Sequence, residues 1–324
     1  MRVILINLAF TLTKIMVLMT MRSVFVFICW YVVSGCTSTY ETIPSANFDS
    51  RIKSIVIHFT AGPYADSLSA LAAPGGLSAH YLIPQHNDPS YQPSKLRIIR
   101  LLPDQARAWH AGVSQWQQRT NLNDTSIGIE LVYEPVCEQS GPLADAAFGA
   151  NRRCSFPAFD EAQLILLKRL LNDITKRFPD IHPTAIVGHA DIAPQRKNDP
   201  GPRFPWEALH NAGFGAWYDP LTFGQYQSMF AQQTPSLLWL ERALQAYGYD
   251  IEPDGCWDDA TSNVITAFHM HFVPELTYAK PQAASFAAIM ALLARYMPAA
   301  EQTLLFEYQT STPLVDPICE VEPN

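Results

Sequence analysis

The side chains with the clearest chemical potential gather on one proline-rich segment, Gly188–Trp206. It carries His189, Lys197 and Asp199, with the aspartate ten residues after the histidine. The prolines and the glycine between Pro194 and Pro205 exclude a helix interior or a central strand. Stiff loops that carry His, Lys and Asp usually serve a site rather than a core. The segment therefore predicts one half of a metal site.

A third candidate ligand, His58, lies near the end of the β-branched run Ile52–Phe59, which predicts a buried strand. A second short strand is expected at Thr184–Gly188, ending at His189. Zinc takes imidazole and carboxylate ligands, and a catalytic zinc site keeps one position open for water. Bound zinc lowers the pKa of that water and polarises a carbonyl group. No local ligand motif joins the three residues, so His58 taken singly is equally well explained as a strand-end histidine.

Interleaved strand and helix patterns predict an α/β domain over residues 51–218. Besides the two strands above, strands are expected at Ser78–Pro84, Leu96–Leu102 and Ser126–Val132, and helices at Ala65–Leu71 and Asp160–Arg177. Residues 219–235 are polar and aromatic with glycine, and predict a linker. Three helical patterns follow at Ser236–Tyr247, Asp258–Phe272 and Gln282–Met297. They predict a small three-helix domain over residues 236–300 and a tail over residues 301–324.

Composition narrows the classes of partner. The chain has 324 residues, 48% of them hydrophobic, and a formal net charge of −8. This length suffices for one domain of ordinary size and a smaller one. A cluster of Lys and Arg that would neutralise phosphates is missing, which argues against a nucleic-acid partner.

The first 36 residues contain basic side chains, no acidic ones and two apolar runs. They end in Val33-Ser34-Gly35-Cys36, which resembles the lipobox of bacterial lipoprotein signal peptides. The resemblance implies cleavage before Cys36, a lipid anchor on that residue and a polar tether over residues 37–50. An ordinary membrane anchor is the alternative, although the run Ser23–Val33 is short for a bilayer span. Thr37 after the cysteine, by resemblance to enterobacterial lipoproteins, implies the outer membrane and a domain that faces the periplasm.

Four cysteines follow the leader: Cys137, Cys154, Cys256 and Cys319. In an exported chain they allow three pairings. We expect Cys137–Cys154 and Cys256–Cys319, because each pair then lies within one domain; free buried thiols are the alternative. No two of them have the Cys-x-x-Cys spacing of a zinc site.

Five segments in order resemble one enzyme family. They are Val56–Ala61, Ser78–Ile83, Ala108–Gly112, Asn123–Leu131 and Gly188–Trp206. Together they resemble the zinc-dependent N-acetylmuramoyl-L-alanine amidases of the amidase_2 family, related to peptidoglycan recognition proteins and phage T7 lysozyme. The resemblance covers roughly residues 50–210 and is closest to the lipoprotein amidases of enterobacteria. It implies an α/β fold with a mixed central β-sheet flanked by helices, Zn²⁺ as cofactor, and peptidoglycan or muropeptides as partners.

The resemblance also implies roles for single residues. His58, His189 and Asp199 occupy the positions of the family's zinc ligands. Glu130 is expected to take a proton from the attacking water and pass it to the leaving amine, and Lys197 to donate to the tetrahedral oxyanion. The alternatives are a salt-bridged strand carboxylate for Glu130 and a solvated loop charge for Lys197.

Three further residues, His80, Trp109 and His110, lie in segments shared with the family and are expected to bind substrate. Trp109 and His110 are expected to stack against sugar or peptide. Structural bracing is an equally weighted alternative for His80 and His110. The helical C-terminal domain resembles small peptidoglycan-binding domains of wall hydrolases; the alternative is a bundle that only packs on the amidase domain.

The sequence thus predicts hydrolysis of the amide between N-acetylmuramic acid, intact or 1,6-anhydro, and L-alanine of the stem peptide. One alternative is a recognition module that binds wall fragments without cutting them. Loss of a zinc ligand would mark that class, and none of the three ligand positions departs from the pattern. The other alternative is hydrolysis of a different amide on the same fold.

Overall fold

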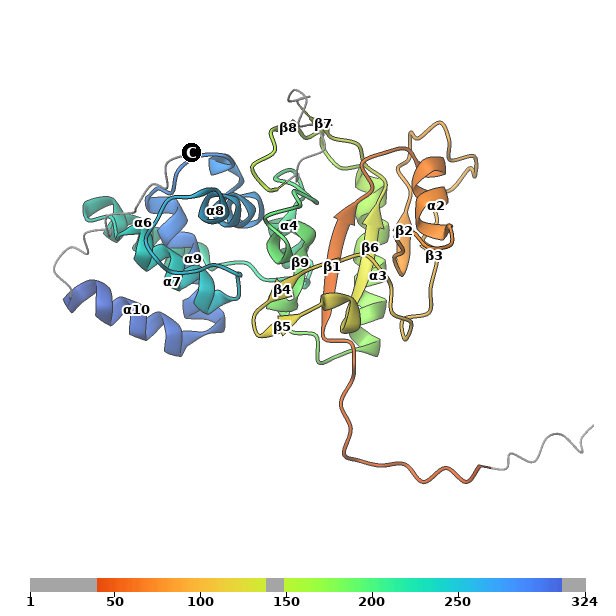
Figure 1. Ribbon diagram of the computed structural model, residues 1–324, viewed down its shortest axis with the longest axis horizontal. Helices are drawn as coiled ribbons and strands as arrows, with labels where there is room; N and C mark the ends of the chain where they lie inside the picture. Colours follow the sequence, from red (N-terminus) through yellow and green to blue (C-terminus); the bar gives the residue numbers. More distant parts are fainter. Residues whose placement is uncertain (1–39, 138–148, 311–324) are drawn as a thin grey trace, which may run out of the picture. The chain divides into compact units, whose positions relative to one another are not determined.

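The computed structural model describes residues 40–137 and 149–310 (Figure 1). The chain divides into two units, residues 1–49 and residues 50–324. In the first unit only Tyr40–Asp49 is described, an exposed segment without helix or strand. The predicted leader with Cys36 lies outside the described residues. Within the described part, no helix is long and apolar enough to cross a bilayer.

A five-stranded mixed sheet, in the order β3-β2-β6-β1-β9, forms the centre of the second unit (Figure 1). Its strands are β1 (Ser54–Phe59), β2 (Tyr81–Ile83), β3 (Ile99–Arg100), β6 (Ser126–Leu131) and β9 (Ile186–Gly188). β2, β6, β1 and β9 are parallel, and only β3 runs antiparallel to its neighbour. The carboxyl ends of the parallel strands therefore meet at one edge, where ligands of open α/β sheets bind. The predicted fold class is confirmed.

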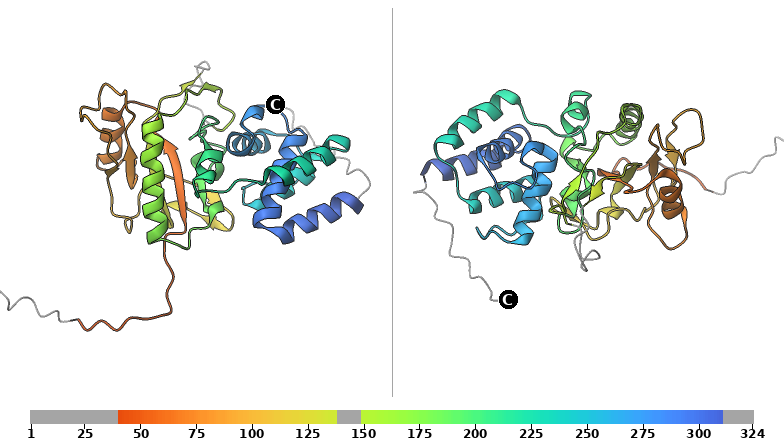
Figure 2. Two further views of the ribbon diagram at one scale, coloured as in Figure 1. Left: turned by 180° about the vertical axis from the view of Figure 1, so that it is seen from behind. Right: turned by 90° about the horizontal axis from the view of Figure 1, so that it is seen from above.

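Helices cover both faces of this sheet. α3 (Glu161–Arg177) runs across one face (Figure 2) and shares a buried apolar cluster with β1 and β6. The carboxylate of Asp160 caps its first turn by accepting from the backbone N–H of Ala162 at 2.9 Å. On the other face, α2 (Tyr64–Ala72) packs through Leu71 against Leu82 of β2. Burial on both faces explains why β1 is an almost continuous apolar run.

Short elements complete this part of the chain. They are β4 (Gln115–Trp116), β5 (Arg119–Thr120), β7 (Val136–Cys137), β8 (Cys154–Ser155), α4 (His189–Ile192), α5 (Trp206–Asn211) and the 3₁₀ turns Leu122–Asp124 and Pro183–Ala185. The predicted disulfide between Cys137 and Cys154 is present and joins β7 to β8. Cys256 is disulfide-bonded, but its predicted partner, Cys319, lies outside the described residues.

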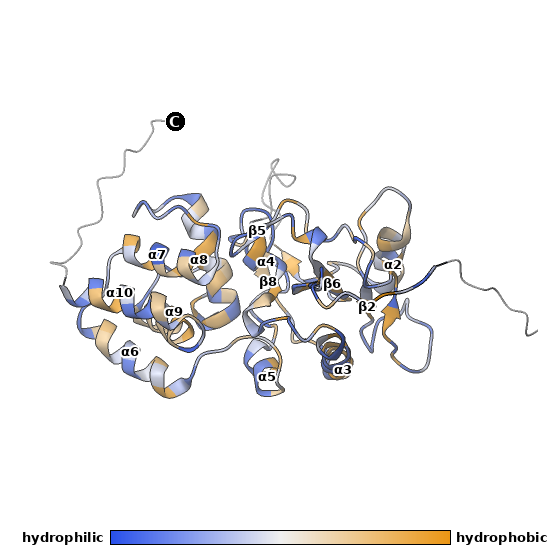
Figure 3. Cartoon of the chain, turned by 90° about the horizontal axis from the view of Figure 1, so that it is seen from below, coloured by the Kyte–Doolittle hydropathy of each residue, from blue (hydrophilic) through white to orange (hydrophobic). Residues whose placement is uncertain are grey.

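The C-terminal region has more helix than the sequence predicts. The three predicted helices correspond to α7 (Leu237–Tyr247), α8 (Asp259–Phe272) and α9 (Ala283–Tyr296). The structure has α6 (Pro220–Gln232) where the sequence predicts a linker, and α10 (Pro298–Thr310) where it predicts the start of a tail. Figure 3 shows these helices together, and α9 contacts α6, α7 and α10.

The prediction fails at α6 because it takes the polar, aromatic and glycine composition of residues 219–235 as the mark of a linker. Asp219 caps the helix by accepting from the N–H of Thr222 at 2.9 Å, and Pro220 takes the first helical position, where its missing N–H costs nothing. Contact with α9 supports the rest of the helix. Packing therefore overrides the unfavourable glycine.

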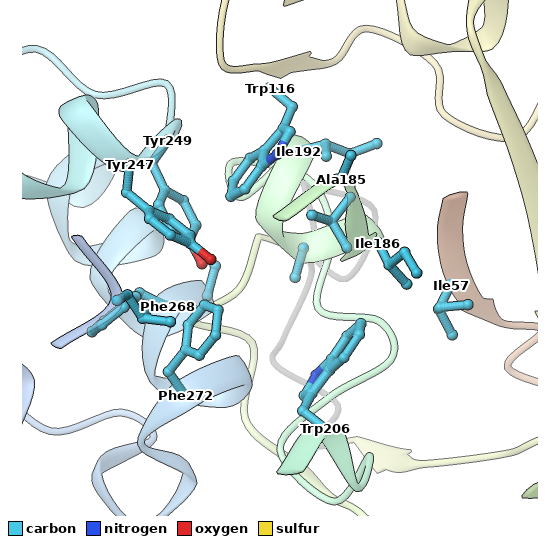
Figure 4. Close-up of a cluster of buried hydrophobic side chains, with 14 of the residues drawn as sticks. Ile57, Trp116, Ala185, Ile186, Ile192, Trp206, Tyr247, Tyr249, Phe268 and Phe272 are labelled. Carbon is cyan, nitrogen blue, oxygen red and sulfur yellow. The ribbon is translucent and has the colours of Figure 1, made fainter. Parts of the chain in front are cut away.

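The C-terminal helices bury aromatic side chains against the sheet domain. Trp116 of β4 meets the ring of Tyr249 edge-on, with centroids 4.9 Å apart, and Phe272 of α8 lies in the same cluster (Figure 4). The backbone N–H of Gln117 also donates to the carbonyl of Gly248 at 2.8 Å. This shared core favours a helical bundle that packs on the sheet domain, the alternative to a separate peptidoglycan-binding domain.

Candidate metal centre and active site

Two neighbouring strands and one loop bring three ligand-type side chains together. His58 lies near the carboxyl end of β1, and His189 begins α4 directly after β9, which is paired with β1. Asp199 reaches the same place from the proline-rich loop. All three residues are buried, and the cluster is the one group of possible metal ligands among the described residues. The structure thus assembles the predicted set.

The three facing atoms form a nearly regular triangle. His58 Nδ1 lies 2.9 Å from His189 Nδ1, and Asp199 Oδ2 lies 3.1 Å and 3.2 Å from these two nitrogens. Tetrahedral zinc with bonds of about 2.0–2.1 Å separates neighbouring ligand atoms by roughly 3.3–3.4 Å. Two imidazoles and a carboxylate at this spacing fit a zinc ion with one position left open.

The hydrogen bond on the far side of His189 supports this fit. Its Nε2 lies 3.1 Å from the carbonyl oxygen of Ala111, which can only accept, so Nε2 carries the proton. In the neutral ring, the Nδ1 lone pair then faces the carboxylate of Asp199. Two acceptors this close require a cation or an additional proton between them.

The surroundings of His58 and Asp199 favour the protonation states that bind a cation. Burial, reinforced by the nearby charge of His189, lowers the pKa of His58 to about 4, so its ring is neutral near pH 7. Burial alone would raise the pKa of Asp199, but without a metal ion a proton on His189 and hydrogen bonds from both histidines hold it far below its usual range. A bound metal ion would take the place of these protons. A neutral imidazole and an ionised carboxylate are the forms that bind metal.

Glu130, a residue of β6, lies beside the cluster of His58, His189 and Asp199. The parallel register pairs it with His58, so both side chains project from the same face of the sheet. Its Oε2 is buried and has no hydrogen-bond partner among the described residues. Burial, then the negative charge of Asp199, raises the pKa of Glu130 to about 8, and the positive charge of Lys197 partly opposes this rise. The carboxyl group can therefore exchange a proton near neutral pH.

Lys197 precedes Asp199 by two residues and is half-buried. Its backbone N–H donates to the carbonyl of Ala193 at 3.1 Å, which fixes the loop at this point. Its charge lowers the pKa of both Glu130 and His58. Lys197 thus adds positive potential to the cluster without being one of its three ligands.

The predicted substrate-binding residues lie in different surroundings. His80 is fully buried: its Nε2 donates to the carbonyl of Ala106 at 3.2 Å and its Nδ1 accepts from the N–H of Gly128 at 3.0 Å. His110 is 6% exposed and lies behind His58. Burial of both rings argues against substrate contact and favours the bracing alternative.

Trp109, by contrast, is 51% exposed. The guanidinium of Arg107 lies 4.3 Å from its ring centroid. Both residues line a cavity of about 710 Å³ together with Leu77 and Leu101. The predicted contact between Trp109 and a ligand stays a prediction.

A second buried polar cluster lies two residues along α4. The Oδ1 of Asp191 accepts from the hydroxyl of Tyr249 at 2.7 Å, and its Oδ2 accepts from the N–H of Gly188 at 2.7 Å and from Nδ1 of His271 at 2.8 Å. The ring of His271 stacks on Trp206 with centroids 3.8 Å apart. Sequence reasoning missed this cluster because 80 residues separate the aspartate from the histidine, and no local pattern links them.

Comparison with known proteins places these features in context. Residues 48–202 match the Amidase_2 family model, described as N-acetylmuramoyl-L-alanine amidase. The chain is 44% identical over 250 residues to N-acetylmuramoyl-L-alanine amidase AmiD of Escherichia coli K12, covering 76% of this chain and 84% of AmiD.

Two solved structures are similar over most of the chain. The crystal structure of AmpDh3 from Pseudomonas aeruginosa superposes with a TM-score of 0.70 and 39% identity, covering 81% of this chain and 98% of AmpDh3. The structure of E. coli AmiD in complex with the substrate anhydro-N-acetylmuramic acid-L-Ala-D-γ-Glu-L-Lys has a TM-score of 0.67 and 40% identity, covering 80% of this chain and 96% of AmiD.

Proposed function

Because the chain belongs to the Amidase_2 family of N-acetylmuramoyl-L-alanine amidases, we propose that it hydrolyses the amide between N-acetylmuramic acid and L-alanine of the peptidoglycan stem peptide. The observation that carries the proposal is the buried triangle of His58, His189 and Asp199 with Glu130 beside it. The substrate named in the AmiD complex supports the same bond and includes the 1,6-anhydro sugar. Both the intact and the anhydro sugar are therefore substrates to test.

The donor set favours zinc as the cofactor. His58, His189 and Asp199 would hold it through two Nδ1 atoms and one carboxylate oxygen. When bound there, zinc polarises the scissile carbonyl and lowers the pKa of water. The two imidazole ligands and one carboxylate suit zinc better than Mg²⁺ or Ca²⁺, which prefer oxygen ligands.

Two side chains, Glu130 and Lys197, supply proton transfer and charge stabilisation. Glu130 accepts the proton of the attacking water and returns it to the nitrogen of the leaving L-alanine, because its carboxyl group projects beside His58 from the same face of the sheet. Lys197 stabilises the negative charge that develops on the carbonyl oxygen. Its ammonium also favours the ionised form of Glu130.

The test is release of stem peptide from purified muropeptides, followed by mass spectrometry. We expect release by the wild-type chain, loss of release after chelation, and a roughly hundredfold to ten-thousandfold slower reaction for Glu130→Gln with zinc binding retained. Unchanged release after chelation or in Glu130→Gln would contradict the proposal. Binding of muropeptide without cleavage in the presence of zinc would favour a recognition module.

We further propose that the mature chain begins at Cys36, carries lipid there and faces the periplasm from the outer membrane. The support is the sequence Val33-Ser34-Gly35-Cys36 and the threonine that follows it. Labelling of cells with radioactive palmitate should mark the wild-type chain and not Cys36→Ala. Equal labelling of both chains would contradict the anchor.

A further inference from the structure

Behind the metal cluster, the side chain of His110 contacts the ligand His58. His58 Nε2 lies 2.9 Å from His110 Nδ1, and both rings are buried. Only one of these two nitrogens can carry the shared proton when both rings are neutral. The direction of this hydrogen bond therefore decides which nitrogen of His58 faces the metal with a lone pair.

The groups around Ser126 fix that direction. Its hydroxyl lies 2.6 Å from the carbonyl oxygen of Leu122, which can only accept, so the hydroxyl proton points there. The Ser126 oxygen must then accept from Nε2 of His110, 3.1 Å away. A neutral imidazole then carries its single proton on that Nε2. His110 Nδ1 is left with a lone pair and accepts from Nε2 of His58.

The next residue along the chain orients the second ligand. The carbonyl of Ala111 accepts from Nε2 of His189 at 3.1 Å. Two successive residues, His110 and Ala111, therefore accept the outer protons of both ligand imidazoles. Each interaction leaves the inner Nδ1 with a lone pair directed at the metal position.

Buried polar contacts hold this short segment in place. The Oδ1 of Asn123 accepts from the backbone N–H groups of His110 at 3.1 Å and Ala111 at 2.8 Å. A guanidinium nitrogen of Arg196 donates to the carbonyl of Ala111 at 3.1 Å. Gly128 lets the ring approach β6, since a Cβ there would lie 2.4 Å from His110 Cγ.

We infer that His110 is a positioning residue of the metal site: with Ser126 and the Ala111 carbonyl, it holds both ligand histidines in the tautomer that presents Nδ1. The inference deepens the proposed function and rests on it, since it concerns the zinc ligands. Outer hydrogen bonds of this kind fix ring orientation and raise the affinity of a histidine for metal. His110 acts through His58 and touches neither substrate nor metal.

The test compares two amide replacements in the full chain. Asn at position 110 places an amide oxygen as many bonds from the backbone as Nδ1, so His110→Asn keeps the acceptor for His58. His110→Gln places its amide near the position of Nε2 and removes that acceptor. Zn²⁺ affinity is measured on metal-free protein by competition with a chromogenic chelator, and unfolding of the metal-free protein is measured alongside.

We expect His110→Gln to weaken zinc binding by about 10–100-fold and His110→Asn to stay within roughly threefold of wild type. A structural role alone would lower the unfolding midpoint of both metal-free variants and leave zinc affinity unchanged. That result, or equal loss of affinity in both variants, would overturn the inference. Wild-type protein that binds zinc and cleaves muropeptide in the same series would leave the proposed function standing.

If the His110 variants do not fold, Asn123 offers a second pair. Asn123→Asp keeps an acceptor for the two backbone N–H groups, and Asn123→Ala removes it. We expect Asn123→Ala to weaken zinc binding more than Asn123→Asp does. Zinc affinity that is equal in the two variants would overturn the inference.

Discussion

The short helix α4 carries two buried polar residues with opposite surroundings. His189, its first residue, turns a lone pair toward Asp199 and His58. Asp191, two residues later, accepts hydrogen bonds from three donors: a hydroxyl, a backbone N–H and an imidazole N–H. Both clusters contain histidine and aspartate. They differ in whether hydrogen-bond acceptors or donors surround the aspartate. Converging acceptors need a cation, whereas a carboxylate surrounded by donors is already satisfied.

The difference assigns a task to each cluster. The first can hold a metal ion, and we propose that Glu130 and Lys197 act beside it. The second ties α4 to the C-terminal region, because His271 of α8 and Tyr249, which follows α7, donate hydrogen bonds to Asp191. The C-terminal helices thereby support the helix that carries a metal ligand.

The largest expected effect is in the metal cluster. Asp199→Ala removes the one charged ligand, so zinc binding should be lost and amide hydrolysis should fall by roughly a thousandfold to ten-thousandfold. Zinc content by atomic emission and peptide release measure the two effects. Asp180→Ala is the matched control, since Asp180 is exposed and pairs with Lys53 only at 3.9 Å. Retained zinc in Asp199→Ala would remove the distinction between the clusters.

The second cluster should respond in stability instead. Asp191→Ala leaves His271 and Tyr249 without their shared acceptor, and breaking a buried pair in this way costs about 3–5 kcal/mol of unfolding free energy. Urea unfolding of the metal-free chain measures this cost, with the exposed Asp173→Ala as control. Unchanged stability would show that the cluster does not tie the helices together.

Lys197→Met separates charge stabilisation from metal binding. Because Lys197 is no ligand, its loss should slow hydrolysis by about a hundredfold to a thousandfold while the bound zinc per chain stays the same. The measurement is turnover of zinc-loaded protein at saturating muropeptide. A variant that loses zinc and activity together would place Lys197 in the metal cluster.

The smallest expected effect is on the pH dependence of stability. It involves His269 of α8, a buried histidine whose two ring nitrogens both have hydrogen-bond partners. His269 donates from Nδ1 to the carbonyl of Leu276 and accepts at Nε2 from the hydroxyl of Ser285, and burial lowers its pKa to about 4. The unfolded chain then binds a proton at this residue below about pH 6.5 while the folded chain does not, so stability falls as the pH drops from about 6.5 to about 4.

The loss from this one residue is on the order of 1–3 kcal/mol. His269→Asn keeps a donor for Leu276 but does not titrate, so metal-free His269→Asn should lose less stability over the same pH range. Unfolding curves at several pH values compare the two slopes. Parallel slopes would contradict a neutral, satisfied His269.

The sequence predicts the sheet and the metal ligands well because both depend on strand ends. β1 and β9 read as apolar runs, and the residues at their ends are His58 and His189, which parallel pairing brings together. The proline-rich loop itself pointed to Asp199, and the resemblance to a family supplied Glu130. The mixed order of the sheet also followed from that resemblance rather than from local patterns.

Other features depend on contacts that no local pattern contains. α6 forms because of its cap and its packing on α9, against its proline and glycine. The role of His110 depends on a ring orientation set by Ser126, which sequence alone leaves open between bracing and substrate contact. The pairing of Asp191 with His271 arises only when α8 docks on α4.

A crystal of the chain grown with zinc and measured at the zinc absorption edge tests the central claim most directly. The account predicts one anomalous peak at about 2.0–2.2 Å from His58 Nδ1, His189 Nδ1 and Asp199 Oδ2, and none at Asp191. A peak bound through a histidine Nε2, a peak between Asp191 and His271, or no peak at the triangle would contradict it.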